Sequence, residues 1–102
     1  MKVSNMISSK GNRVANQFII EDCVLNYPCN DDIINGNMFQ SYQSNIAFIG
    51  YYNSGHKVVL LDSKYWDYSV ITGKYRNQFL GETKKETQKK IDSGEYLLAN
   101  LN

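Results

Sequence analysis

The stretch Lys57–Gly81, KVVLLDSKYWDYSVITGKYRNQFLG, carries two different hydrophobic patterns in succession. It opens with the apolar run Val58–Leu61, which predicts a buried β-strand. Further along, four aromatic or branched residues recur at spacings of three, four and four, which predicts one buried face of a helix: Tyr68, Ile71, Tyr75 and Phe79. Gly81 fits the left-handed residue that commonly ends a helix. The stretch therefore predicts a strand followed by a helix.

The residues that follow predict a second, shorter helix and a last strand. Thr83 and Glu86 have the spacing of a capping box, in which each side chain accepts from the other residue's backbone. A short helix over 84–92 should follow and close at Gly94, and residues 95–101 form a strand candidate. The first helix has three candidate N-cap residues: Asp67, Ser69 and Thr72.

The residues that precede the stretch predict antiparallel pairing. Residues 16–20 form a first strand candidate, and residues 38–52 predict one long or twice-bent strand that ends at a turn over 53–55. Residues 1–12 are polar and predict a frayed lead-in, whereas residues 21–37 predict an irregular excursion with a tight turn at Asn35-Gly36.

Together these patterns predict one α+β domain over residues 1–102. We expect a small antiparallel sheet of about four to five strands, packed against one or two short helices from the C-terminal half. The chain has 102 residues, 42% of them hydrophobic and 21% charged, which is typical of a single folded domain. It contains no run of about 20 apolar residues and no signal-like start, so we expect a cytoplasmic protein and no membrane partner.

Charge is unevenly distributed although the net charge is only +1. Residues 21–32 hold four carboxylates and no Lys or Arg: Glu21, Asp22, Asp31 and Asp32. Residues 64–90 hold seven basic residues against three acidic ones, and the basic residues are Lys64, Lys74, Arg76, Lys84, Lys85, Lys89 and Lys90. A molecule with two such poles can steer a partner to one side.

The side chains that usually perform catalysis or bind metals are few and scattered. His56 is the only histidine and lies in a predicted turn, where an exposed position is expected. Cys23 and Cys29 have five residues between them and lack the further ligands that a zinc site needs, so we expect reduced thiols. Because no phosphate-binding loop or calcium-loop spacing occurs either, the sequence predicts no catalytic residues, no metal site and no cofactor.

The basic block alternates with aromatic residues, as in Lys64–Tyr68 and Lys74–Arg76. Aromatic rings stack on unpaired bases and cations neutralise phosphates, so this pattern suits nucleic-acid binding. Two other interpretations remain open, namely a structural helix with a solvated basic face and a docking surface for an acidic protein.

The blocks Lys64–Ser69 (KYWDYS), Lys74–Leu80 (KYRNQFL) and Ser93–Tyr96 (SGEY) stand in an order that resembles a family of small uncharacterised proteins. That family is carried by phages and plasmids of Gram-positive bacteria, and the resemblance runs from Met6 over most of the chain. The chain departs from the family pattern at 21–37, where a shorter hairpin is usual. The resemblance implies the setting of a mobile-element accessory gene and assigns no residue a role.

The favoured hypothesis is a non-catalytic protein that binds a host or defence-system protein. It would act as an inhibitor, for example of a nucleic-acid-processing enzyme, through the acidic residues of 21–32. One alternative is direct nucleic-acid binding through the basic residues of 64–90. Another is a structural protein that self-associates.

Overall fold

The computed structural model describes residues 1–26 and 33–102. Their six strands are β1 (Lys2–Ile7), β2 (Arg13–Asn26), β3 (Ile33–Ser41), β4 (Ser44–Tyr52), β5 (Lys57–Asp62) and β6 (Leu97–Ala99). The two helices, α1 (Val70–Leu80) and α2 (Lys84–Asp92), lie between β5 and β6. The α+β class and the C-terminal position of the helices are therefore confirmed, but the sheet has six strands rather than four to five.

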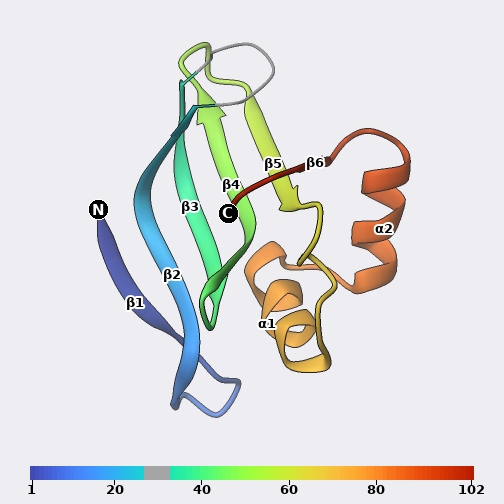
Figure 1. Cartoon of the computed structure of the whole chain (residues 1–102). Helices are drawn as coiled ribbons and strands as arrows, with labels where there is room; N and C mark the ends of the chain where they lie inside the picture. The colour runs from blue at the N-terminus through green and yellow to red at the C-terminus, as the bar shows by residue number, and fades with distance from the viewer. Residues whose placement is uncertain (27–32) are drawn as a thin grey trace.

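The strands lie in the sheet in the order in which they occur in the chain, from β1 to β6. The first five are antiparallel neighbours, whereas β6 runs parallel to β5. A parallel neighbour needs a long crossover connection, and here α1 and α2 provide it. The expectation of a wholly antiparallel sheet is thus wrong for the last pair. Figure 1 shows both helices on the β5–β6 side of the molecule, with α1 nearer than α2 to the β3–β4 turn.

The first residues form an edge strand rather than a frayed lead-in. Lys2 to Asn5 pair with Glu21 to Phe18 of β2, and Met6 is only 2% exposed within the core. The remaining residues of β1 are polar or partly exposed, as an edge position permits, so the strand has weak hydrophobic alternation. Backbone pairing and one buried methionine therefore order a segment whose polar composition predicts a frayed lead-in.

Residues 21–37 also differ from the prediction. Strand β2 continues to Asn26, with a register shift between Ile20 and Cys23 and a left-handed Asp22 at a φ of 54°. Such a bulge lets a long strand bend without ending. Asn35 and Gly36 lie inside β3, not in a turn.

A close approach between two strands explains Gly36. It pairs with Gly50 of β4, and a Cβ atom at Gly36 would collide with the carbonyl oxygen of Ile49. The turn that divides the predicted 38–52 strand into β3 and β4 is at Tyr42-Gln43, where Tyr42 has a φ of 56°. Tyrosine rarely adopts this conformation, and neither position of the turn holds one of the usual turn residues. The sequence therefore gives no signal for this turn.

The core consists of two apolar clusters on opposite faces of the sheet. Strand β5 contributes to both, because Val59 and Leu61 belong to one cluster while Val58 and Leu60 belong to the other. This explains its continuous apolar run, and the predicted buried strand is confirmed. The first cluster also includes Tyr75 of α1.

Helix α1 begins after Ser69, one of the three candidate N-caps, and ends as predicted, with a left-handed Gly81 after its last turn. Half of the predicted stripe faces inward, since Tyr75 is buried and Phe79 is half-buried. In contrast, Ile71 is 52% exposed and Tyr68, outside the helix, is 65% exposed. The residues that face inward also have helical spacing: Thr72, Tyr75, Arg76 and, half-buried, Phe79. Two of these four are polar, so a hydrophobicity pattern does not reveal the face.

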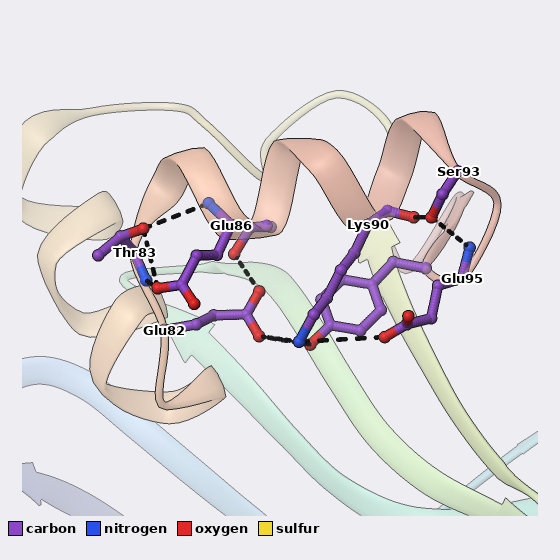
Figure 2. Close-up of polar contacts among 8 residues, drawn as sticks. Glu82, Thr83, Glu86, Lys90, Ser93 and Glu95 are labelled. Carbon is purple, nitrogen blue, oxygen red and sulfur yellow. Dashed lines mark hydrogen bonds and ion pairs between the residues drawn. The ribbon is translucent and has the colours of Figure 1, made fainter.

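Helix α2 is fixed at both ends by polar contacts (Figure 2). The predicted capping box between Thr83 and Glu86 is present. The carboxylate of Glu82, whose side chain is 5% exposed, accepts hydrogen bonds from Thr87 at 2.6 Å, Tyr96 at 2.6 Å and Lys90 at 2.9 Å. These three donors tie the start of α2 to its last turn and to the segment leading into β6.

Burial raises the pKa of Glu82, but the hydrogen bonds from Thr87, Tyr96 and Lys90 outweigh burial and leave the pKa below its ordinary value. The same network raises the pKa of Lys90, mainly through the hydrogen bond with Glu82. Burial, with the hydrogen bond to Glu82, raises the pKa of Tyr96 to about 12. At neutral pH the network therefore contains a carboxylate, an ammonium group and a neutral phenol.

We predict that Glu82→Gln lowers the free energy of unfolding by about 1–3 kcal/mol at pH 7, because a charged acceptor of three hydrogen bonds is lost. A carboxylate with a lowered pKa stabilises the fold above its ordinary pKa of about 4.3 and stops doing so as pH falls through the lower folded value. The difference between wild type and variant should therefore shrink between about pH 5 and pH 3 in urea unfolding. Glu95→Gln is the control, since Glu95 is 62% exposed and 3.9 Å from Lys90. Equal effects of the two substitutions would contradict the prediction.

Candidate functional site

The segment 63–69, here called the β5–α1 loop, is held at its start by Asp62. Asp62 is 1% exposed, and its Oδ2 accepts from the backbone N–H groups of Lys64 at 3.1 Å and Tyr65 at 2.8 Å. Its Oδ1 accepts from the Leu101 N–H at 2.8 Å and from the Asn102 side chain at 3.0 Å. One buried carboxylate thus joins the loop to the C-terminal residues.

The same loop is held at its other end by Arg76 of α1. The guanidinium donates to the Trp66 carbonyl at 2.7 Å, to Asp67 Oδ1 at 3.4 Å and to Asn77 Oδ1 at 3.0 Å, and it lies 5.2 Å from the centre of the Trp66 ring. Arg76 is 1% exposed, so its side chain is buried rather than part of an exposed basic face as the sequence predicted. A planar group with several donors suits this position because it must satisfy several acceptors at once.

A hollow of about 610 Å³ lies between this loop and the first turns of both helices. We call it the basic hollow, and it is lined by Asp67, Ser69, Val70, Gly73, Lys74, Arg76, Asn77 and Lys84. Three cations and one carboxylate line it, so its net charge is +2. Sequence positions separated by ten residues, Lys74 and Lys84, are brought to the same surface.

The electrostatics of the basic hollow favour an anion. The hydrogen bond from Lys84, at 2.7 Å, lowers the pKa of Asp67, and the charges of Lys84 and Arg76 lower it further against the effect of burial. Asp67 is therefore ionised at neutral pH and is shared by two cations. The N-terminal end of α1, which has no acidic residue in its first turn, adds partial positive charge beside Ser69 and Val70.

A second hollow, of about 690 Å³, lies on the other side of the β5–α1 loop. We call it the aromatic hollow, and it is lined by Asn16, Phe18, Ser41, Tyr42, Gln43, Ser44, Tyr65 and Tyr68. Asp67 and Ser69 line the basic hollow while Tyr68, between them, lines the aromatic one, so the loop separates two adjacent hollows.

The rings of the aromatic hollow come from three separate parts of the chain. Tyr65 and Tyr68 meet edge to face with their centres 5.6 Å apart, and the Lys64 ammonium lies 5.2 Å from the Tyr65 ring. Tyr42 is positioned by its N–H, which donates to the Asn16 carbonyl at 2.7 Å. Sequence analysis missed this site because Phe18 and Tyr42 come close to the loop only through strand pairing.

The predicted basic residues separate into four groups. Lys74, Arg76 and Lys84 line the basic hollow, and Lys64 stands beside the aromatic one. Lys90 belongs to the Glu82 network. Lys85 and Lys89 are exposed on α2 and line neither hollow.

Two of the four residues of the predicted acidic site lie in the described part of the chain. Glu21 and Asp22 lie in β2 beside its bulge, whereas Asp31 and Asp32 fall outside the described residues. The ends of β2 and β3 that flank those residues lie at the opposite end of the sheet from α1 (Figure 1).

The remaining candidates lie away from both hollows. His56 is exposed after the β4–β5 turn, as expected. Cys23 is half-buried in β2, where burial raises the pKa of its thiol, and Cys29 falls outside the described residues. Within residues 1–26 and 33–102, no three side chains among His, Cys, Asp and Glu gather as metal ligands would.

Fold and surface together define a small α+β domain with a basic and an aromatic hollow on either side of one loop. A family of unknown function, DUF8033, matches residues 1–95, and the chain belongs to that family. No curated protein matches the chain. No solved structure matches it. In the described part of the chain, neither helix has the length and apolar character to cross a membrane.

We predict that Arg76→Lys lowers the free energy of unfolding by about 2–4 kcal/mol, because an ammonium group cannot reach all the acceptors of the guanidinium. Lys85→Ala is the control and should change stability by less than about 0.5 kcal/mol, since Lys85 is exposed. Chemical denaturation measures both. A change below about 0.5 kcal/mol for Arg76→Lys would show that the buried contacts of Arg76 contribute little.

Proposed function

We propose that this chain is a non-catalytic protein that binds nucleic acid, with the phosphate backbone in the basic hollow. The supporting observation is the convergence of Lys74, Lys84 and the start of α1 on one hollow of net charge +2. Backbone N–H groups at a helix start and nearby ammonium groups are the usual donors to phosphate oxygens.

Lys84 keeps capacity for a second anion. Its side chain is 57% exposed, and its ion pair with Asp67 uses one direction of an ammonium group that has three donors. Lys74 is exposed on α1, one helical turn after Val70. Arg76, whose guanidinium is buried, contributes positive charge to the hollow rather than a mobile contact.

The expected affinity is modest. The overall charge is only +1, and two or three lysines reach a ligand at this surface: Lys64, Lys74 and Lys84. Non-specific complexes of this kind have dissociation constants on the order of 10⁻⁴–10⁻⁶ M at physiological salt. Each neutralised phosphate releases counterions, so log K should fall with log salt at a slope of roughly −2.

The rival hypothesis, antagonism of a host or defence protein in a phage or mobile-element setting, stays a prediction. It depends on the carboxylates of residues 21–32, half of which lie outside the described residues. The basic hollow has a defined geometry and therefore gives the nucleic-acid hypothesis the stronger support.

We predict that Lys74→Gln/Lys84→Gln weakens binding of a fluorescent 12-nucleotide strand at least about fivefold and makes the salt slope shallower by about one. Lys85→Gln/Lys89→Gln is a matched control, because it removes the same charge from the same part of the chain without touching either hollow. Fluorescence anisotropy at several salt concentrations measures both variants. Equal losses for the two pairs would indicate diffuse attraction, and no binding by the wild type at low salt would remove the proposal.

A further inference from the structure

We infer that the aromatic hollow receives an unpaired base, so that the ligand is a single strand rather than a duplex. This inference rests on the proposed function, because it takes the neighbouring basic hollow as the phosphate site. It adds what that proposal leaves open, namely the strandedness of the ligand and the side chains that select it.

The rings of the hollow are accessible for stacking. Tyr42 is 50% exposed and Tyr68 is 65% exposed, although both are large aromatic side chains in a chain with a well-filled core. Bases stack on such rings with little dependence on sequence, because every base has a π-face. The volume of about 690 Å³ lies within the range of sites that enclose small organic groups.

The hollow also has polar groups that match the edge of a base. Asn16 and Gln43 offer amides that both donate and accept, and Ser44 adds a hydroxyl. A base presents donors and acceptors on the same edge, and these are free only when the base is unpaired. A duplex buries both its stacking faces and its pairing edges, so it can use neither the rings nor the amides.

The two hollows adjoin across the β5–α1 loop, so one strand could contact both. Consecutive residues Tyr68 and Ser69 line the aromatic and the basic hollow respectively. Positive charge stands near the aromatic hollow, with Lys64 beside Tyr65 and Lys74 in the neighbouring basic hollow. This positive charge favours an anionic strand over a ligand without negative charge at the same rings.

The backbone holds this arrangement in place. Asn16 and Tyr42 both have left-handed backbone conformations, with φ of 64° and 56°, and their main chains are joined by a hydrogen bond of 2.7 Å. Ser41, which is 3% exposed, contacts Thr72 of α1 at 2.9 Å and so ties the strand end to the helix. The rings are therefore presented by a fixed frame, which lowers the entropy cost of binding.

The test compares four ligands of equal length on the wild-type protein by competition: oligo(dT)₁₂, the corresponding uridine strand, an abasic 12-mer with the same phosphates, and a 12-base-pair duplex. We expect the deoxythymidine strand, the uridine strand or both to bind about tenfold or more tightly than the abasic strand and the duplex. A difference between the two base-bearing strands then reports the combined effect of the 2′-hydroxyl and of the thymine methyl group.

Tyr42→Ala/Tyr68→Ala should reduce binding of the preferred strand to the abasic level. Tyr51→Ala is the matched control, since Tyr51 is 52% exposed on β4 and lines neither hollow. The comparison of ligands uses unaltered protein, so it stands even if the double variant folds poorly.

The outcomes separate the two proposals. If all four ligands bind equally and the Tyr42/Tyr68 variant behaves like the Tyr51 control, the inference is overturned while the basic hollow remains a phosphate site. If the duplex binds more tightly than every single strand, the inference is likewise overturned. If no ligand binds at low salt, the proposed function fails, and the inference fails with it.

Discussion

Two buried charged side chains, Asp62 and Arg76, determine the shape of the β5–α1 loop, and both hollows depend on that loop. A charge removed from water costs several kcal/mol unless neighbouring groups satisfy it. Asp62 obtains four N–H donors and Arg76 obtains three acceptors, and most of these partners belong to the loop or to the chain end beside it. In this loop conformation both charges therefore have several partners, and of their polar atoms only Nε of the Arg76 guanidinium lacks one among the described residues.

The sheet and the helices position the other walls of the two hollows. Pairing of β2, β3 and β4 brings Phe18 and Tyr42 to the same end of the sheet as the loop. The parallel pairing of β5 and β6 requires a crossover, which α1 and α2 form, and the first turns of both helices line the hollow that includes Asp67. The Glu82 network then fixes α2 and so keeps the Lys84 ammonium 2.7 Å from the Asp67 carboxylate.

Local signals predicted part of this structure and non-local contacts determined the rest. The run Val58–Leu61, the caps Ser69 and Gly81, and the Thr83–Glu86 box act within a few residues and could be predicted from sequence. The burial of Arg76 could not, because its partners at Trp66 and Asp67 lie about ten positions away and a hydropathy pattern treats arginine as exposed. The aromatic hollow was missed for the same reason, and β1 was missed because a polar edge strand has little hydrophobic alternation.

Hydrogen exchange of the backbone amides of Lys64, Tyr65 and Trp66, followed by NMR on the wild-type protein, tests the central claim most directly. The amides of Lys64 and Tyr65 donate to the Asp62 carboxylate, and that of Trp66 donates to the Asp62 carbonyl at 3.0 Å. The account predicts exchange at least about a hundredfold slower than that of the exposed turn amide of Ser54. Exchange of all three loop amides at the rate of Ser54 would show that the buried charges do not hold the loop.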